Sequence, residues 1–190
     1  MSVGPQTRLT SHTREGVIRL EHPKWADFDE WVAIREMSRV SLQRWEPDWD
    51  DSHSDRKAFK ARLGAYRRLA TSGSAFPFHV FGPDGRLVGG CNLSDIKRAS
   101  AQSAQIGYWV GEPYRRRGYA LGAVEAALRF AFGPLGLHRV EAAVQDSNIA
   151  SVRMLEAAKF QPEGIARGYL KIQGKWADHR IWARLAGDAP

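Results

Sequence analysis

The sequence predicts an α/β domain with one mixed, mostly antiparallel, twisted sheet of about seven strands, flanked by about four helices. Three observations lead to this class. Segments with apolar residues at every second position alternate with segments in which they recur every three or four positions. Several of the strand segments are joined by short turns, which connect antiparallel strands. The 190 residues match one ordinary domain, 1–190, without a linker or an internal repeat.

The first half of the chain predicts one strand and two helices. Residues 1–13 are polar and carry a glycine and a proline, so we expect a flexible tail there. Residues 17–20 predict a strand, and helical spacing of apolar residues over 25–34 predicts the first helix. Residues 45–51 form a loop with two tryptophans and four acids, and a Ser-x-x-Asp pattern then caps a second helix over 55–70.

The second half is richer in strand signals. A Gly-Pro-Asp-Gly sequence at 82–85 and a Gln-Gly pair at 173–174 each separate two apolar runs, as in hairpins. The expected strands are 76–81, 86–93, 103–110, 138–144, 165–172 and 176–185, and the expected helices are 120–131 and 148–158.

The composition excludes several classes of protein. Apolar residues make up 43% and charged residues 26% of the chain, as in globular domains. No stretch approaches the ~20 apolar residues that span a bilayer, and the first residues lack a signal-peptide core. A single cysteine, Cys91, excludes a disulfide framework, and we expect it to be a small buried hydrophobe and not a nucleophile. We therefore expect a soluble cytoplasmic protein without a metal, and the net charge of +7 permits a phosphate or nucleic-acid ligand.

The most informative segment lies between the strand that ends at Val110 and the helix that follows it. This loop is rich in arginine and glycine, and unpaired backbone N–H groups at a helix N-terminus can hold a phosphate. Gly118 would let the backbone approach such a ligand closely. A solvated basic turn that caps the helix is the alternative. The loop residues concerned are Arg115, Arg116, Arg117, Gly118, Tyr119 and Ala120.

The pattern Arg115-x-x-Gly118-x-Ala120 resembles the Arg/Gln-x-x-Gly-x-Gly/Ala signature of the Gcn5-related N-acetyltransferases (GNAT). Its context is similar to the RimJ/RimL branch, which acetylates N-terminal α-amines of ribosomal proteins. That context comprises Gly107–Val110, Leu137–Ala142, Asn148-x-x-Ser151, Phe160, Gly168–His179 and Trp45-Glu46-Pro47. The likeness covers about residues 14–186. It implies a GNAT-like fold with acetyl-coenzyme A as the acetyl donor.

The resemblance also implies where acetyl-coenzyme A binds. The arginine and glycine loop would hold the pyrophosphate, and Asn148 would contact the pantetheine arm, with a helix cap as its alternative role. Backbone N–H groups near Trp109 and Val110 would meet the thioester carbonyl, where this strand splays from its neighbour.

The residue that would protonate the thiolate leaving group differs from the usual family pattern. Many family members carry a tyrosine seven residues after the asparagine of the motif, where this chain has Leu155. The resemblance implies that Ser151 protonates or holds the thiolate, and helix capping is the alternative.

A proton acceptor for the amine has several candidates. An α-amine has a pKa of ~7.7–8.0 and needs only a weak base. Glu141 lies on the strand beside the cofactor strand, two residues before the position of the catalytic glutamate in related peptide acetyltransferases, here Ala143. A structural pair with an arginine is the alternative for Glu141, and Glu46 and Asp178 are further candidates.

The acceptor is expected to enter between the loop 45–51 and the turn near 173–176. Four acids in this loop could attract a cationic N-terminal segment, and its tryptophans could cover apolar side chains. Alternatively, the acids favour the next helix N-terminus and the tryptophans pack inward. The residues predicted to bind the acceptor are Trp45, Glu46, Asp48, Trp49 and Trp176.

The sequence therefore predicts an N-acetyltransferase that acts on a protein N-terminus, with a ribosomal protein as the expected partner. One alternative acceptor is a small amine such as an antibiotic or a polyamine. A non-catalytic RNA- or ribosome-binding module is another, because the helix 55–70 is strongly basic. Direct nucleic-acid binding is disfavoured, since that helix lacks interleaved aromatic residues. No membrane partner is expected, and both monomer and homodimer remain open.

Overall fold

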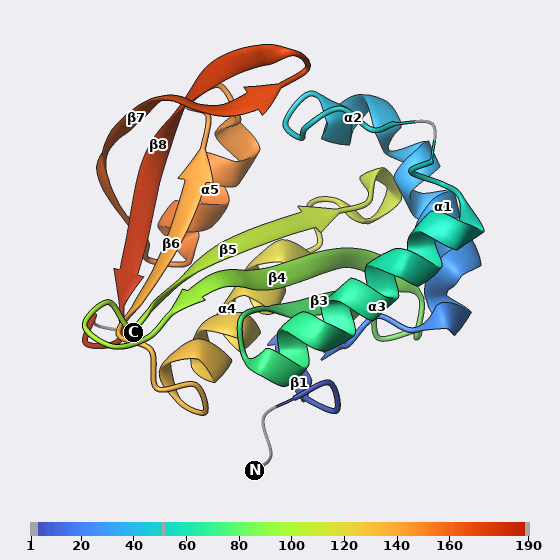
Figure 1. The fold of residues 1–190 in the computed structure, drawn as a ribbon, viewed down its shortest axis with the longest axis horizontal. Helices are drawn as coiled ribbons and strands as arrows, with labels where there is room; N and C mark the ends of the chain where they lie inside the picture. The colour runs from blue at the N-terminus through green and yellow to red at the C-terminus, as the bar shows by residue number, and fades with distance from the viewer. Residues whose placement is uncertain (1–3, 51, 189–190) are drawn as a thin grey trace.

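An open eight-stranded sheet runs through the computed structural model, which describes residues 4–50 and 52–188 (Figure 1). The strands are β1 (Arg8–Thr13), β2 (Gly16–Glu21), β3 (Phe76–Phe81), β4 (Leu87–Lys97), β5 (Ser103–Val110), β6 (Arg139–Val144), β7 (Gln161–Ile172) and β8 (Lys175–Leu185). The helices are α1 (Phe28–Met37), α2 (Arg39–Gln43), α3 (Arg56–Ser72), α4 (Tyr119–Phe132) and α5 (Ile149–Ala157). The strand order is β1-β2-β3-β4-β5-β6-β8-β7, and only β5 and β6 pair in parallel.

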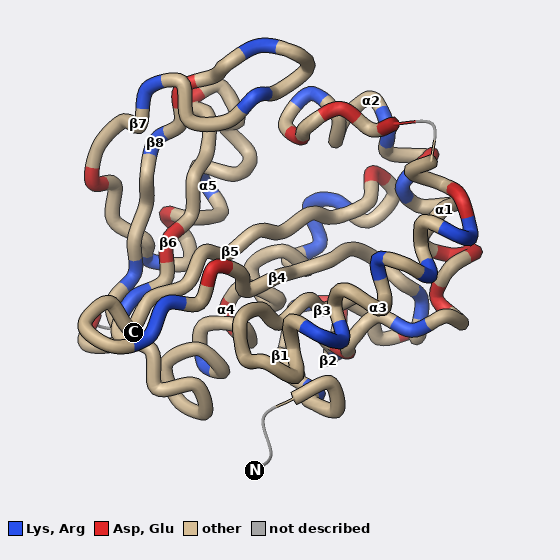
Figure 2. The backbone as a smooth tube through the Cα atoms, viewed as in Figure 1, with Lys and Arg blue, Asp and Glu red and all other residues tan. Residues whose placement is uncertain are grey.

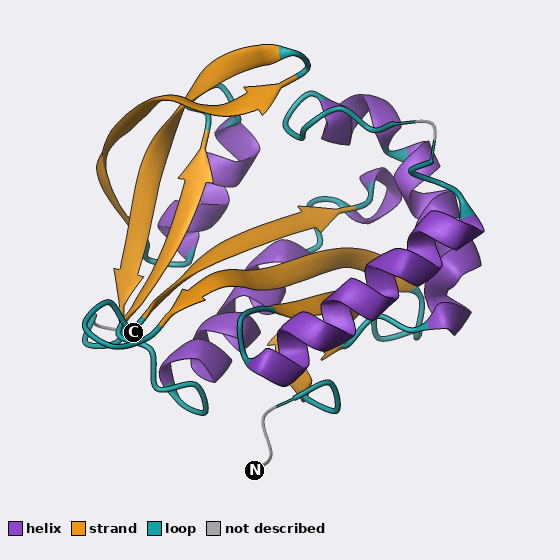
Figure 3. Ribbon diagram, in the orientation of Figure 1, coloured by secondary structure: helices purple, strands orange, loops and turns teal. Residues whose placement is uncertain are grey.

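Helices cover both faces of the sheet (Figure 3). On one face, α4 packs against β1, β2, β4 and β5 and contacts α5, and its alanine-rich stripe is fully buried there. On the other face, α1 packs on β4 and α3 packs on β3. A separate cluster around Phe28, Trp31 and Phe59 fills the space under these two helices. This two-sided burial is the predicted α/β class.

The expected tail over residues 1–13 is wrong for residues 8–13, which form β1. Its pairing with β2 runs from Arg8 opposite Glu21 to Thr13 opposite Gly16. The side chains of this strand alternate between buried or half-buried positions and exposed ones. A polar edge strand of this kind lacks a strong apolar signal, so its polarity suggested disorder. Residues 1–3 lie outside the described part of the chain.

The described residues form eight strands and five α-helices, where about seven and four were expected. The additional elements are β1 and the five-residue helix α2. The hairpin of β3 and β4 and the bounds of β5 agree with the sequence prediction.

The strands β5 and β6 diverge from each other in the middle of the sheet. Pairing between β5 and β6 covers only Ser103–Gln105 with Arg139–Glu141. Beyond these residues β5 continues toward α1, whereas β6 leads to α5 and the β7–β8 hairpin (Figure 1). Backbone groups on the facing edges of the two strands are therefore left without strand partners. This divergence positions the site described below.

Basic residues are spread along α3 (Figure 2). Part of this charge is engaged within the protein. Arg56 pairs with Asp29 at 2.7 Å and lies over the Phe28 ring at 4.4 Å. Arg62 lies over the Trp31 ring at 4.7 Å. Within the described residues, no helix is long and apolar enough to cross a membrane.

Candidate active site

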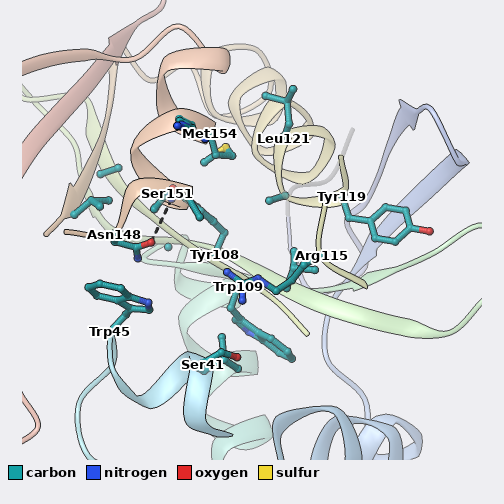
Figure 4. A pocket seen from close by; sticks show the side chains of 18 of the residues that line it. Ser41, Trp45, Tyr108, Trp109, Arg115, Tyr119, Leu121, Asn148, Ser151 and Met154 are labelled. Carbon is teal, nitrogen blue, oxygen red and sulfur yellow. Dashed lines mark hydrogen bonds between the residues drawn. The ribbon is translucent and has the colours of Figure 1, made fainter. Parts of the chain in front are cut away.

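A cavity of about 670 Å³ opens where β5 and β6 diverge (Figure 4). Its walls come from residues 106–110 of β5, 142–145 around the end of β6, the loop before α4, and the first turns of α5. A further wall comes from α2 and the loop after it, through Ser41, Leu42, Trp45 and Glu46. The cavity therefore joins the predicted cofactor loop to part of the predicted acceptor loop.

The loop before α4 leaves the first backbone N–H groups of the helix without a side-chain cap. Gly118 is the N-cap of α4 and has φ +81°, and no side chain caps the first turn of the helix. An added Cβ at Gly118 would meet no protein atom within 4 Å, so the space beside this residue is open. Uncapped N–H groups and the positive end of the helix dipole favour a phosphate here.

The three arginines of the loop have different surroundings. Arg115 and Arg116 line the cavity, and Arg115 pairs with Glu112 at 2.9 Å. Arg117 is not among the cavity-lining residues, and its guanidinium lies over the Tyr114 ring at 5.8 Å. Arg14, between β1 and β2, donates a hydrogen bond to the carbonyl of Arg116. This last contact holds the loop through a residue that is distant in the sequence, so no local sequence pattern predicts it.

The other two loop residues contribute mainly through the backbone. The ring of Tyr119 is buried in the core under α4 and points away from the cavity (Figure 4). Ala120 lines the cavity at the next position of the helix. A small residue there leaves room for a ligand at the helix N-terminus.

The ladder pattern of β5 distinguishes the two backbone donors that the sequence suggested. Gly111 donates its N–H to Val88 of β4 at 2.9 Å. Because the direction of backbone groups alternates along a strand, Trp109 also points its N–H toward β4. The N–H of Val110 points the other way, into the space that β6 has left. Val110 is therefore the better placed donor for a thioester carbonyl.

The start of α5 brings a hydroxyl pair into the cavity. Asn148 caps the helix by accepting a hydrogen bond from the N–H of Ser151 at 3.3 Å. The hydroxyl of Ser151 does not cap the helix, and instead lies 2.5 Å from the phenol oxygen of Tyr108 on β5. Burial raises the pKa of the Tyr108 phenol, so it stays protonated. Leu155 is fully buried one turn further on.

Glu141 forms the ion pair that was the alternative to a catalytic role. Its carboxylate lies 2.7 Å from Arg139, which also holds Glu163. Glu141 pairs with Gln105 at the last position before β5 and β6 diverge, and it is not among the described residues that line the cavity. Ala143, two residues further along β6, lines the cavity, whereas Glu141 lies where β5 and β6 are still paired.

The acceptor loop is held by an arginine that sequence patterns did not single out. Arg35 of α1 is buried, and its guanidinium binds both carboxylate oxygens of Glu46, at 3.0 and 2.5 Å. Trp49 donates its indole N–H to Glu46 at 2.8 Å and stacks over Arg35 at 4.0 Å. An arginine on the apolar face of a helix, one turn after Trp31, was the only sequence signal for this contact.

The remaining predicted acceptor residues lie outside the cavity. Asp48 is exposed, and Trp176 is 69% exposed at the tip of the β7–β8 hairpin. Asp178, which was a candidate proton acceptor and not an acceptor-binding residue, accepts a hydrogen bond from the N–H of Gly168 at 2.7 Å and so links β7 to β8. None of the three is among the described residues that line the cavity. Asp51, part of the expected acidic cluster, lies outside the described residues.

Cys91 is fully buried under α4, with its thiol 3.9 Å from the carbonyl of Ala123. Burial raises the pKa of this thiol to about 12, so it is protonated at neutral pH. Across residues 4–50 and 52–188, no group of three or more His, Cys, Asp or Glu side chains is placed to hold a metal ion.

Comparison with known proteins agrees with this geometry. The "Acetyltransferase (GNAT) domain" family model matches residues 18–161. An Escherichia coli [ribosomal protein uS5]-alanine N-acetyltransferase is 34% identical over 187 residues, covering 97% of this chain and 93% of the relative. The structure of Mycobacterium smegmatis RimJ in complex with CoA-disulfide is 30% identical, with a TM-score of 0.92, covering 100% of this chain and 92% of that one. A ribosomal-protein-S5-alanine acetyltransferase from Vibrio fischeri is 26% identical, with a TM-score of 0.85, covering 95% and 99%.

The chain belongs to the GNAT acetyltransferase family. It is an acyltransferase of the acetyl-coenzyme A-dependent class, with the mixed, twisted sheet of that fold.

Proposed function

We propose that the protein transfers the acetyl group of acetyl-coenzyme A to the N-terminal α-amine of a protein, and that this protein is ribosomal. The observation that carries the acceptor class is the 34% identity, over 97% of this chain, to an enzyme named for the alanine of a ribosomal protein. The cytoplasm, where ribosomal proteins are made, is then the expected location.

The residues present fit acetyl-coenzyme A. The uncapped first turn of α4 and the side chains of Arg115 and Arg116 would bind the pyrophosphate. The free edge of β5 would hydrogen-bond the pantetheine arm as a neighbouring strand does, with Asn148 on the opposite wall. The thioester supplies an activated acetyl group, so the protein must mainly position it against the amine.

Two further jobs fall to groups in the cavity. The N–H of Val110 would stabilise the negative charge that develops on the carbonyl oxygen. The hydroxyl of Ser151, held by Tyr108, would donate to the sulfur as it departs. Ser151 lies on the cavity wall beside Asn148, so the same helix start would serve both the pantetheine arm and the sulfur (Figure 4).

The acceptor would enter from the side of α2 and the loop after it. Trp45 and Glu46 line this wall, and Trp45 is partly exposed with Arg44 over its ring at 4.5 Å. An extended peptide N-terminus would enter between this wall and the end of β6, whose residues line the opposite side of the cavity. Asp48 and Trp176 would contact residues of the acceptor beyond the first few.

The test is the release of free thiol from acetyl-coenzyme A across a panel of acceptors. The panel contains peptides that begin with alanine or serine, the same peptides with a blocked N-terminus, a polyamine, an aminoglycoside and an RNA oligonucleotide in a binding arm. We expect turnover only with the free N-terminal peptides. Turnover restricted to the small amines would identify the alternative acceptor class, and RNA binding without turnover would identify a binding module.

A further inference from the structure

The cavity contains one carboxylate among the described residues that line it, and this carboxylate is Glu46. Its side chain is 28% exposed, so it is reachable from the cavity. Glu141, the candidate favoured by sequence, is paired elsewhere. In the proposed function the acceptor amine enters along the wall on which Glu46 lies. Glu46 is therefore the carboxylate that a cationic N-terminus would meet among the described residues of the cavity wall.

Glu46 is held in one orientation by its partners. The planar fork of Arg35 engages one oxygen through Nη1 and the other through Nη2, and Trp49 donates to Oε2 as well. Of the two oxygens, Oε1 accepts one of these hydrogen bonds and Oε2 accepts two. A carboxylate oxygen can accept two, so Oε1 retains a lone pair for an incoming N–H group.

Arg35 is in turn held in place by two tryptophan rings and a histidine. Its guanidinium lies 4.0 Å from the Trp49 ring and 4.9 Å from the Trp109 ring. Its Nε donates to Nε2 of His53 at 3.3 Å. All three nitrogens of the guanidinium therefore have partners, and the group has little freedom to release Glu46.

Trp109 connects this cluster to the strand that carries the thioester. Its indole lies across Gly90 of β4, where an added Cβ would be 2.5 Å from the indole nitrogen. Only glycine at that position leaves room for the ring. The backbone of the same residue precedes Val110, the expected carbonyl donor. The carboxylate and the donor are thus tied to each other through Arg35 and Trp109.

We propose that Glu46 receives the acceptor amine and takes its proton, and that Arg35 is the positioning residue that presents Glu46 to it. The inference rests on the proposed function, since it assumes an amine acceptor in this cavity. As the nitrogen–carbon bond forms and the carbon–sulfur bond breaks, the proton on nitrogen passes to Oε1 of Glu46, directly or through a water. The thiolate takes a proton from the hydroxyl of Ser151. Solvent then returns a proton to Ser151 and removes the proton from Glu46.

The charged and titratable neighbours of Glu46 are arginines and one histidine, so Glu46 is the group among them that can take a proton from the amine. Arg35 faces it from α1, and Arg39 of α2 lies over the Trp49 ring at 5.1 Å. His53 stacks on Trp49 at 4.2 Å, and the charge of Arg62 on α3 also acts on His53. Burial, together with the charges of Arg35 and Arg62, lowers the pKa of His53 to about 4, so His53 is neutral near pH 7.

The test compares Glu46→Gln with Glu36→Gln, using a peptide with a free N-terminal alanine. Glu36 is an exposed residue of the same region that also binds an arginine through both oxygens, Arg39 at 2.9 and 2.6 Å. We expect Glu46→Gln to lower kcat about a hundredfold or more, as for loss of a general base. Glu36→Gln should keep wild-type turnover, and acetyl-coenzyme A should bind both variants as it binds the wild type.

Two readouts distinguish a proton acceptor from a structural residue. In Glu46→Gln the rate should keep rising above about pH 8.5, because hydroxide must replace the missing proton acceptor, whereas the wild type levels off once its amine is neutral. Formate should restore part of the turnover of Glu46→Ala, because it can occupy the site beside Arg35. An unchanged pH profile together with no rescue would overturn the proposal, even if turnover were low.

Arg35→Lys separates positioning from charge. It keeps a cation but loses the planar fork, so we expect a raised KM for the peptide and a lower kcat with unchanged acetyl-coenzyme A affinity. In the double variant with Glu46→Gln the losses should not add, since both act through one carboxylate. Additive losses would contradict the positioning role.

The proposed function and this inference fail in distinguishable ways. If the wild type acetylates only a small amine, the acceptor class is wrong, and the same variants can be assayed with that amine. If the wild type acetylates the peptide and Glu46→Gln does so equally well, the inference is wrong and the function stands. The inference is also wrong if Glu46→Gln melts at a much lower temperature while it retains full turnover, since Glu46 would then serve the fold alone.

Discussion

The phenol oxygen of Tyr108 lies 2.5 Å from the hydroxyl oxygen of Ser151, and both side chains line the cavity between β5 and β6. The tyrosine that many GNAT enzymes place on the helix is replaced here by Leu155, which is buried in the core. The pair therefore brings a phenol from the strand to a serine at the start of α5. In the proposed mechanism the phenol would donate to the serine oxygen, which leaves the serine proton free for the departing sulfur.

Removing either hydroxyl should slow the chemical step. We expect Ser151→Ala and Tyr108→Phe each to lower kcat by about tenfold or more, the low end of acid–base effects, because a thiolate leaves readily. Acetyl-coenzyme A affinity should change by less than about threefold, or ~0.7 kcal/mol. Calorimetry and steady-state kinetics together give both values.

The control for this pair is Tyr66→Phe, which removes a phenol on α3, outside the cavity-lining residues. It should leave turnover unchanged. The double variant Ser151→Ala with Tyr108→Phe should be little worse than either single variant, because the two hydroxyls act as one unit. Wild-type turnover in Ser151→Ala would reduce that serine to a packing residue.

Gly118 is required for two reasons that a substitution can separate. Its φ of +81° is strained for other residues, and the open space beside it is the expected place of the pyrophosphate. Gly118→Val should weaken acetyl-coenzyme A binding by at least about tenfold, or ~1.4 kcal/mol. Isothermal titration calorimetry measures this directly.

Gly136 provides the matched backbone control. It also has positive φ, at +61°, with open space around it, but lies after the far end of α4. Gly136→Val should lose thermal stability to a similar degree and keep its affinity for acetyl-coenzyme A. Equal affinity losses in the two variants would mean that the effect at Gly118 is general strain.

Cys91→Ala should keep full turnover. The thiol is buried on the α4 side of the sheet, and burial raises its pKa to about 12. A thiol that is neither exposed nor ionised cannot attack the thioester. Mass spectrometry of the protein after incubation with acetyl-coenzyme A checks this, and an acetyl group trapped on Cys91 would refute a direct transfer to the amine.

His53 should make the fold sensitive to acid. Its pKa is lowered to about 4, from an ordinary value of 6.5, by burial and by the nearby arginines Arg35, Arg62 and Arg39. Between these values the unfolded chain binds a proton that the folded protein does not. Stability from this group is therefore complete above about pH 6.5 and is lost as the pH falls toward about 4.

The variant His53→Gln keeps a hydrogen-bond acceptor for Arg35 but does not titrate. Its urea midpoint should fall less than that of the wild type between about pH 7 and pH 4.5. His138→Gln, at an exposed position, controls for the substitution itself. Parallel midpoints for wild type and His53→Gln across this range would contradict the assignment.

Much of the fold could be predicted from sequence because its signals are local. The Gly-Pro-Asp-Gly turn and the alternation over Ser103–Val110 predicted the β3–β4 hairpin and β5 without reference to the rest of the chain. The edge strand β1 was missed, because its stability comes from pairing with β2 and from the cover of α4. The helix α2, with five residues, is too short to show a period.

The site could be predicted only where one segment carries the chemistry. The loop before α4 was found because its glycine and arginines are adjacent in sequence. Tyr108 looked like a core residue of an alternating strand, and its pairing with Ser151 depends on where α5 packs. Arg35 could not be chosen without Glu46, Trp49 and Trp109, which reach it from separate segments.

The proposed acceptor can be tested most directly with one peptide that carries two amines. The peptide begins with alanine and contains one internal lysine, and it is incubated with acetyl-coenzyme A and the enzyme at about pH 7.5, just below the ordinary pKa of an α-amine. Fragmentation by mass spectrometry then locates the acetyl group. We expect the acetyl group on the α-amine. This amine is partly neutral at this pH and, at the end of the peptide, would be the first group to enter the cavity and meet Glu46. An acetyl group on the lysine side chain, or none on the peptide while a small amine is acetylated, would contradict N-terminal acetylation.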